Sequence, residues 1–554
     1  MKGNHLSPKL AWTISGSVCV FCIICAFAAL WIFDVIDLPG LGRFDTLIHP
    51  ASGSSAGVNA SSPSTFTAAS ALTPRYPAPS LATTSDDQWN QQMTADSTWP
   101  EKTGAKSVNM SALSKATSDF SSLTGSPVKA SYLIANGDGT MVASSNAHKL
   151  LEPASTMKML TTLAATRVLD LSKRLPTDVF LLSPSTSASP VASSKSASDV
   201  PTLVIRGGGD MLLGAGTSDP THVNGRAGLA TLTAQTVAAL RHQGIHRVKL
   251  VSDTTLFGPV RRPKIMSADY VQTGFFAPTS ALAVDEGRTT APGDPDSMTH
   301  ITYPRASHPA TAAVEMFADQ LIRAGVKLTN NKSGAHAYII PAASKHERDM
   351  ITASAKGATH TNQKRHMRLF TRSSSTLKRI GRVESAPLSE ILQLMLTISD
   401  NTLAEEFGRL TALALGTGNS PDGAVKAVET ELAKSHISLE KGHIADCSGL
   451  SPGSRLTASV LFHVIRYLRE NANADALRGL PVVLDGKPVY SHDAAGRVRL
   501  KTGSLDTVSS VCGIILRKNG GFFYYTGIAN VPDGWTKAGG YTALHTLANA
   551  LVDL

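Results

Sequence analysis

Residues 153–171 read PASTMKMLTTLAATRVLDL, and this stretch joins a nucleophile motif to the pattern of a buried helix. Leu160 and Leu163 begin an apolar face at helical spacing. Ser155 and Lys158 stand three positions apart at the start of this helix, so their side chains lie on the same face. A hydroxyl with an amine beside it is the pair that nucleophilic acyl transfer requires.

A second motif, Ser399-Asp400-Asn401, lies between two helical patterns at residues 388–396 and 402–415. Its side chains therefore project from a turn between helices. A serine and an amide placed there can relay a proton and hold a polar substrate group.

The third motif, Lys501-Thr502-Gly503, closes the alternating stretch 497–500 and precedes strand patterns at residues 508–516 and 522–528. The pattern predicts that Lys501 lies on the edge of a sheet. An extended peptide can add itself to such an edge as one more strand.

Each motif alone is weak, because a serine-rich chain produces copies by chance. Ser126-Pro-Val-Lys129 and Lys102-Thr-Gly104 are such copies, and neither stands in the helical or strand context that its motif needs. The ordered set 155–158, 399–401 and 501–503 is therefore the informative feature.

The chain resembles the D-alanyl-D-alanine carboxypeptidase/endopeptidase family, the class C low-mass penicillin-binding proteins. The resemblance runs from about residue 126 to the C-terminus, and the long gap between Ser155 and Ser399 suits a family whose members insert extra domains there. The matching blocks are Pro153-Ala-Ser-Thr-Met-Lys158, Gly207-Gly-Gly-Asp210, Asp253-Thr-Thr-Leu-Phe257, Ser399-Asp-Asn-Thr-Leu-Ala-Glu405, Asp446-Cys-Ser-Gly-Leu-Ser451 and Gly496-Arg-Val-Arg-Leu-Lys-Thr-Gly503.

This resemblance implies an α/β (α+β) fold, with a β-lactamase/transpeptidase-like domain of antiparallel sheet and helices that is interrupted by inserted smaller domains. We expect the catalytic domain to comprise residues 126–190 and 380–554, and the inserted part to comprise residues 191–379. The implied enzyme is a serine-type D-Ala-D-Ala carboxypeptidase or endopeptidase, which needs no cofactor.

The expected catalytic residues are Ser155, Lys158, Ser399 and Asn401. Ser155 would attack the carbonyl of a D-alanyl-D-alanine bond after Lys158, with a pKa lowered by burial and by the nearby cation Lys501, removes its proton. Ser399 would relay a proton to the leaving amine. Asn401 would hold the substrate amide and orient Lys158.

The expected substrate-binding residues are Lys501, Thr502, Gly503 and Ser504. Lys501, Thr502 and Ser504 would hold the terminal carboxylate of the peptide. The backbone N–H groups of Ser155 and Ser504 would form the oxyanion hole.

Two other functions stay open on the sequence alone. A β-lactamase would carry the same motifs but would release the acyl group rapidly. A wall-binding or β-lactam-sensing domain would keep the fold without turnover. Carboxypeptidase and endopeptidase action differ only in which D-alanyl bond is presented, so the motifs do not separate them.

The N-terminal part predicts a membrane attachment. Lys2 and Lys9 precede an apolar run from about residue 10 to residue 36, long enough to cross a bilayer. We expect residues 1–38 to be an uncleaved anchor, with a cleaved signal peptide as the alternative. Residues 39–125, rich in Ser, Thr, Ala and Pro, would be a tether that holds the enzyme at the extracytoplasmic face of the cell membrane.

Composition limits the classes of binding partner that we expect. The formal net charge of +10 favours anionic surroundings such as wall polymers, and no basic patch with interleaved aromatic residues indicates nucleic acid. The 17 histidines show no metal-ligand spacing, so we expect no metal. The expected partners are peptidoglycan stem peptides and, as covalent inhibitors, β-lactams. Cys447 stands where the family resemblance leads us to expect glycine, and it can pair with Cys512 or remain a free thiol.

Overall fold

A computed structural model describes residues 107–182, 200–289, 303–330, 377–471, 474–483 and 489–554. The described chain is built around two five-stranded sheets and one two-stranded sheet. The first sheet has the order β10 (Val498–Leu505), β11 (Val508–Leu516), β12 (Phe522–Asn530), β1 (Lys129–Asn136) and β2 (Met141–Ser145). All its neighbouring strands are antiparallel.

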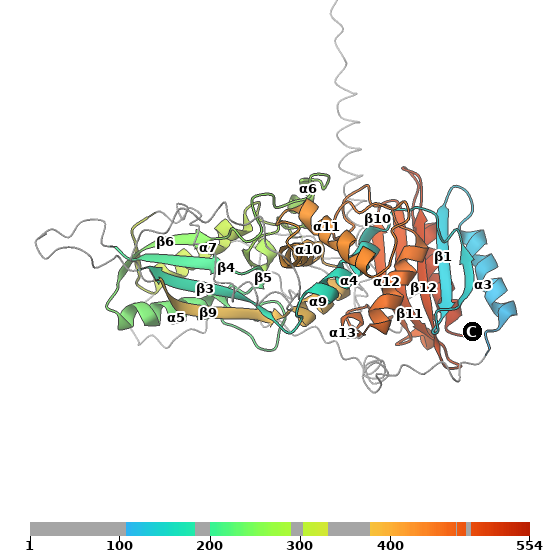
Figure 1. Cartoon of the computed structure of the whole chain (residues 1–554), viewed down its shortest axis with the longest axis horizontal. Helices are drawn as coiled ribbons and strands as arrows, with labels where there is room; N and C mark the ends of the chain where they lie inside the picture. Colours follow the sequence, from blue (N-terminus) through green and yellow to red (C-terminus); the bar gives the residue numbers. More distant parts are fainter. Residues whose placement is uncertain (1–106, 183–199, 290–302, 331–376, 472–473, 484–488) are drawn as a thin grey trace, which may run out of the picture. The chain divides into compact units, whose positions relative to one another are not determined.

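Helices cover both faces of this first sheet, as its alternating side chains require. In β12, Tyr524 and Ile528 belong to the core under the larger helical layer, whereas Phe523 and Tyr525 belong to the core under the opposite layer. The larger layer contains α4 (Lys158–Val168), α9 (Leu388–Thr397), α10 (Asn401–Leu415), α11 (Pro421–Lys434), α12 (Ala458–Glu470) and α13 (Ala474–Leu477). The opposite layer contains α3 (Met110–Leu123) and α14 (Ala538–Leu551), and Figure 1 shows α3 on the far side of the sheet from α12.

Helix α3 lies inside the predicted tether, and for residues 110–123 that prediction is wrong. Leu113, Ala116 and Phe120 are buried at helical spacing in the core that α14 shares. Asn109 caps the helix by accepting a hydrogen bond from the backbone N–H of Ala112 at 3.1 Å. Three apolar residues among many Ser and Thr are therefore enough to fix this helix on the sheet.

The second sheet forms the insertion. Its order is β8 (Lys327–Leu328), β6 (Arg247–Asp253), β4 (Thr202–Gly207), β3 (Arg174–Leu182) and β9 (Leu377–Pro387). It is mixed: β3 is antiparallel to both β4 and β9, whereas β4, β6 and β8 are parallel. Helices α5 (Leu229–His242) and α7 (Pro309–Arg323) share a second hydrophobic core with this sheet.

A short segment of the insertion reaches the catalytic domain. It contains α6 (Asp269–Gln272) and leads into β7 (Leu282–Val284), which pairs in parallel with β5 (Asp210–Leu213). The strand pairing also gives domain limits that differ from the predicted ones. β3 and the last part of β9 pair inside the insertion, so the insertion spans residues 174–387, wider than the predicted 191–379.

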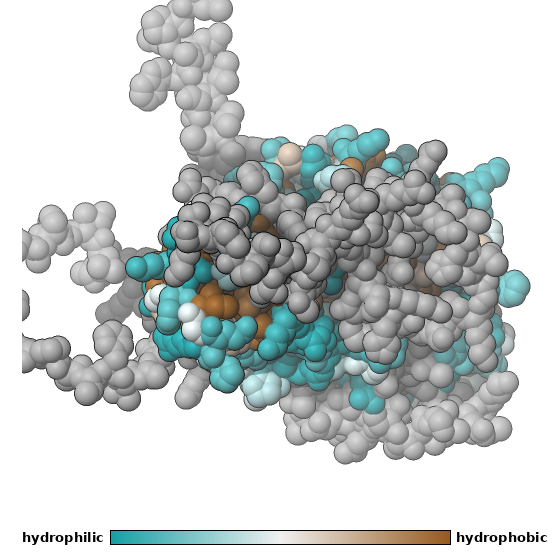
Figure 2. Space-filling model, turned by 60° about the vertical axis from the view of Figure 1, so that its left-hand side comes forward, coloured by the Kyte–Doolittle hydropathy of each residue, from teal (hydrophilic) through white to brown (hydrophobic). Residues whose placement is uncertain are grey.

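The mixed α and β architecture, with an antiparallel sheet interrupted by an inserted domain, confirms the predicted fold class. In the view of Figure 2 the described surface is largely hydrophilic, with a small hydrophobic area. The predicted membrane anchor lies outside the described residues, and none of the helices within the described ranges is long and apolar enough to span a bilayer. Cys447 and Cys512 are both buried free thiols, which answers the pairing question left open by the sequence.

Candidate active site

Ser155 and Lys158 lie where a tight turn becomes a helix. A 3-10 turn, η1 (Ala154–Met157), precedes α4, and Lys158 is the first residue of α4. The ammonium nitrogen Nζ of Lys158 donates to Ser155 Oγ at 2.9 Å. Ala154 has a φ of 44°, a left-handed conformation that a residue with a side chain adopts at a cost. Strain of this kind is often found at functional sites.

The Lys158 amine uses its full donor capacity. It donates to Ser155 Oγ, to Asn401 Oδ1 at 2.7 Å and to the Ser448 carbonyl at 2.8 Å, which matches the three donors of an ammonium group. We call Ser155, Lys158, Asn401 and the Ser448 carbonyl the lysine centre. None of the three acceptors carries a formal charge.

Burial controls the protonation of this amine. Desolvation lowers the pKa of Lys158 to about 8, although the charges of Asp400, Asp446 and Glu405 act in the opposite direction. A substantial fraction of Lys158 is thus neutral near pH 8, and a neutral amine can accept the proton of Ser155.

Lys501 contacts the second motif and lies fully buried. Its Nζ donates to Ser399 Oγ at 2.8 Å and to the Thr502 carbonyl at 2.9 Å. Burial, and secondly the charge of Lys158, hold the pKa of Lys501 well below its ordinary value. Ser399 has a φ of 58°, so the serine of the second motif is also held in a left-handed conformation.

Asp400, the middle residue of the second motif, has a structural role. Asp400 is the N-cap of α10, and its carboxylate accepts from the Leu403 backbone N–H at 2.9 Å. This cap fixes the start of α10 and places Asn401 in its first turn. The position of Asn401 beside Lys158 therefore depends on the helix start.

Strand β10 packs directly against the nucleophile turn, and Gly503 makes this approach possible. A Cβ atom at Gly503 would lie 2.3 Å from Ser510 Oγ, 2.7 Å from the Pro153 carbonyl and 2.8 Å from the Ser155 backbone nitrogen. Only a glycine fits at this distance. β10 is the end strand of its sheet, as the strand pattern predicts, and Thr502 is exposed on it.

The structure adds the Ser448 carbonyl, which the motifs did not identify. Asp446 holds its loop by accepting from the backbone N–H groups of Ser448 at 3.2 Å, Gly449 at 2.6 Å and Ser451 at 2.7 Å. The loop itself was singled out in the sequence as the block Asp446-Cys-Ser-Gly-Leu-Ser451. That its carbonyl faces Lys158 could not be read from the sequence.

A second residue missed by the motifs is Lys537, which lies just before α14. Its half-buried amine donates to Ser504 Oγ and, at 2.8 Å, to the Leu505 carbonyl. Burial lowers the pKa of Lys537 to about 8, against the charge of Asp506. Its distance of 33 positions from Ser504 along the chain gives no signal in sequence.

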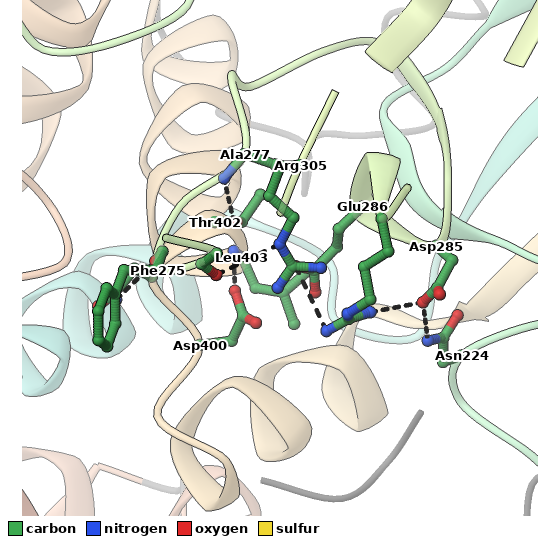
Figure 3. Close-up of polar contacts among 12 residues, drawn as sticks. Asn224, Phe275, Ala277, Asp285, Glu286, Arg305, Asp400, Thr402 and Leu403 are labelled. Carbon is green, nitrogen blue, oxygen red and sulfur yellow. Dashed lines mark hydrogen bonds and ion pairs between the residues drawn. The ribbon is translucent and has the colours of Figure 1, made fainter. Parts of the chain in front are cut away.

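The insertion contributes directly to the site. The carbonyl of Phe275 accepts from Asn401 Nδ2 at 2.9 Å. The backbone N–H of Ala277 donates to Thr402 Oγ1 at 2.9 Å (Figure 3). The Asn401 amide is thus bonded at both ends, with its nitrogen toward Phe275 and its oxygen toward Lys158. Within the described ranges, no group of three or more His, Cys, Asp or Glu side chains is arranged to hold a metal ion.

A buried lysine bonded to a serine at a helix start, beside the edge strand of an antiparallel sheet, defines a serine acyl-transfer enzyme. The model of the D-Ala-D-Ala carboxypeptidase 3 (S13) family matches residues 110–336 and 366–548. The chain belongs to this family and is a serine DD-peptidase of peptidoglycan.

Individual relatives agree. The chain is 30% identical to carboxypeptidase DacB of Mycolicibacterium smegmatis, over 72% of this chain and 75% of the relative. It is 28% identical to a carboxypeptidase of Mycobacterium tuberculosis, over 69% of this chain and 71% of the relative. The fold is similar to that of penicillin-binding protein 4 from Haemophilus influenzae, with a TM-score of 0.57 and 18% identity over 79% of this chain and 99% of that one.

Proposed function

We propose that the enzyme cleaves the terminal D-alanyl-D-alanine bond of peptidoglycan stem peptides through an acyl-Ser155 intermediate. The observation that carries this proposal is the 2.9 Å contact between Ser155 Oγ and the buried amine of Lys158. A serine hydroxyl is a weak nucleophile until a base removes its proton, and a lysine with a pKa of about 8 is suited to that task.

In the acylation step, neutral Lys158 takes the proton of Ser155 while Oγ bonds to the carbonyl carbon of the penultimate D-alanine. While Lys158 carries this proton, its ammonium group donates hydrogen bonds to Asn401 Oδ1 and the Ser448 carbonyl. The peptide C–N bond then breaks as Ser399 gives its hydroxyl proton to the nitrogen of the departing D-alanine. Ser399 is reprotonated with the proton that Lys158 took from Ser155, so Lys158 returns to its neutral form. Water later attacks the ester and restores Ser155.

Lys501 acts in this scheme through Ser399. Its buried amine donates to Ser399 Oγ, which fixes the hydroxyl that relays the proton. Thr502 and Ser504 bind the terminal carboxylate of the substrate. Lys501, which is buried next to Thr502, supplies positive charge to this site. Lys537 adds a second cation, since its amine already contacts Ser504 Oγ.

The oxyanion is bound by the backbone N–H groups of Ser155 and Ser504. Gly503 supports this assignment, because its lack of a side chain lets β10 lie against the Ser155 backbone nitrogen. The substrate extends along the edge of β10 as an added strand. The same edge would accept a cross-linked peptide, so endopeptidase action is part of the proposal.

β-Lactams are proposed to acylate Ser155 in the same way as the peptide. Attack on the cyclic amide leaves the former leaving group attached to the acyl chain, so the ester persists. The apolar run at residues 10–36 is proposed to attach the enzyme to the extracytoplasmic face of the cell membrane, which would bring it close to the wall.

The test is release of free D-alanine from a synthetic peptide that ends in D-Ala-D-Ala, with Ser155→Ala as the control. We expect release by the native enzyme and none by the variant. Fast hydrolysis of penicillin without release of D-alanine would indicate a β-lactamase. Binding of the peptide without either reaction would indicate a wall-binding domain.

A further inference from the structure

The insertion holds a buried cluster of charges close to the second motif. We call Asp285, Glu286, Arg288 and Arg305 the insertion ion cluster. Figure 3 labels Asp285, Glu286 and Arg305. Arg305 Nη2 lies 3.2 Å from Glu286 Oε2, and Arg288 Nη2 lies 3.8 Å from the same atom. Arg288 Nη1 donates to Asp285 Oδ1 at 2.5 Å. Glu286 and Arg305 are 1% and 3% exposed.

The backbone of this cluster is held in an unusual conformation. Asp285 and Glu286 have φ values of 47° and 51°, and Gly287 follows with 71°. Two consecutive residues with side chains rarely occupy this region, and they stay there only when surrounding contacts hold them. Asn224 supplies one such contact by donating to Asp285 Oδ1 at 2.7 Å. This hydrogen bond helps to hold the strained backbone of the cluster.

Arg305 connects this cluster to the segment that reaches Asn401. Its Nε donates to the Gly274 carbonyl at 3.3 Å, and its backbone N–H donates to the Val271 carbonyl at 2.9 Å. The next residue, Phe275, places its carbonyl 2.9 Å from Asn401 Nδ2. A continuous path of contacts therefore leads from Glu286 through Arg305 and the Gly274–Phe275 backbone to the lysine centre.

We propose that the insertion ion cluster is a positioning group for catalysis, which fixes the Asn401 amide so that its oxygen faces Lys158. This inference rests on the proposed roles of Ser155 and Lys158. The Phe275 carbonyl accepts hydrogen bonds and donates none, so it admits only the nitrogen end of the amide. The oxygen end is thereby directed to the Lys158 ammonium group.

Loss of this restraint has a definite consequence at Lys158. An amide free to rotate presents its NH2 group to the amine for part of the time, and the ammonium form then loses one acceptor. Because a hydrogen bond to the charged form stabilises that form, its loss lowers the pKa of Lys158 further. The other charged groups near Lys158 are Asp400, Glu405, Asp446 and Lys501, and none of them belongs to the cluster.

The charges around Glu286 determine which variants are suitable for the test. Burial and the nearby Asp400 raise the pKa of Glu286, whereas Arg288 and Arg305 act against this rise. Removal of Arg305 alone would leave Glu286 with a less compensated charge, so Arg305→Met is paired with the double variant Arg305→Met/Glu286→Gln. Arg305→Lys keeps the charge but removes the planar guanidinium donor to Gly274.

The matched control is Arg382→Met. Arg382 on β9 makes a bidentate ion pair with Asp178 on β3, at 2.6 Å and 2.7 Å, within the insertion sheet. The measurement is the rate of acylation by benzylpenicillin as a function of pH on both sides of pH 8, together with the thermal midpoint.

We expect Arg305→Met to slow acylation about 10- to 100-fold, since small displacements of catalytic groups have effects of that size. The pH at which the rate is half-maximal should fall, and Arg305→Lys should recover part of the rate. Arg382→Met should lower the thermal midpoint and leave the acylation rate and its pH profile unchanged. Adding Arg305→Met to Asn401→Ala should cause no further loss, because the effect passes through Asn401.

The inference is overturned if Arg305→Met matches Arg382→Met in rate and pH profile, or if it slows the Asn401→Ala enzyme as much as the native enzyme. If Arg305→Met does not fold, the double variant with Glu286→Gln and Arg305→Lys are judged by the same criteria. A native enzyme that is not acylated at all would instead refute the proposed function of Ser155.

Discussion

The lysine centre and the insertion ion cluster differ in the groups that surround their buried charges. In the lysine centre, a buried amine is bonded only to neutral oxygens, and its pKa falls to about 8. In the cluster, buried arginines face carboxylates at ion-pair distance. Neutral acceptors leave a lysine able to lose its proton, whereas paired charges hold a geometry. Catalysis needs the first property and positioning needs the second.

Removal of the Lys158 amine should have the largest effect on the rate of acylation. Lys158→Met deletes the base and leaves Ser155 Oγ, Asn401 Oδ1 and the Ser448 carbonyl without their shared donor. We expect acylation by penicillin to fall by roughly 10⁴-fold or more, as for other residues that act as one catalytic unit. Stopped-flow or quenched acylation measurements would check this. A loss below tenfold in a folded variant would exclude Lys158 as the base.

Gly503→Ala should disturb the nucleophile without touching either charged group. The new Cβ would meet the Ser510 hydroxyl and the Pro153 and Ser155 backbone at 2.3 to 2.8 Å, so the strand or the turn must move. We expect a decrease in acylation rate of about 100-fold, similar to the loss of one oxyanion donor. Gly534→Ala is a useful control, because no atom lies within 4 Å of its added Cβ, although its φ of 83° also brings strain. Equal rates for the two variants would contradict the proposed role of Gly503.

Lys537→Met tests whether substrate recognition uses a cation outside the three motifs. Hydrogen bonds to charged groups contribute about 1.5–3 kcal/mol, so we expect roughly a 10- to 100-fold lower kcat/KM for a peptide with a free terminal carboxylate. The same peptide with a terminal amide should lose much less, and Lys537→Arg should lie between. An equal loss for the carboxylate and the amide would mean that Lys537 only supports the fold of the Ser504 region.

The smallest expected effect is the pH dependence of the acylation rate, which reports the protonation of Lys158. In the proposed mechanism Lys158 reacts in its neutral form, and the pKa of this amine is about 8. The acylation rate should therefore fall tenfold for each pH unit below this value and level off above it. A profile flat from neutral pH through this value would show that the proton of Ser155 is taken by another group.

The chain sequence contains much of this site, but not all of it. Ser155, Lys158, Asn401 and Lys501 were identified because each carries its chemistry in the side chain and stands in a recognisable local pattern. The carbonyls of Ser448 and Phe275 could not be identified, since every residue has a carbonyl and only the fold decides which one faces an amine. A long-range contact such as that of Lys537 has the same difficulty.

For the fold, too, local patterns are predicted from the sequence, whereas long-range packing is not. The antiparallel strands at residues 498–530 are predicted from alternation and turns, and the structure confirms them. The sequence predicts a tether over residues 110–123, because the apolar residues there are diluted by Ser and Thr, whereas burial of Leu113 and Phe120 fixes α3 on the sheet. A strand pattern does not tell which sheet a strand joins, so the predicted catalytic domain includes residues 174–182, which form β3 of the insertion.

The most direct measurement is the mass of the intact protein after incubation with benzylpenicillin, followed by peptide mapping of the modified residue. We expect one adduct, on the peptide that contains Ser155, and no adduct on Ser155→Ala. The variant should keep its fold, because alanine removes only the hydroxyl of a half-buried side chain. An adduct on another residue, or none on folded native protein, would contradict the assignment of Ser155 as the nucleophile.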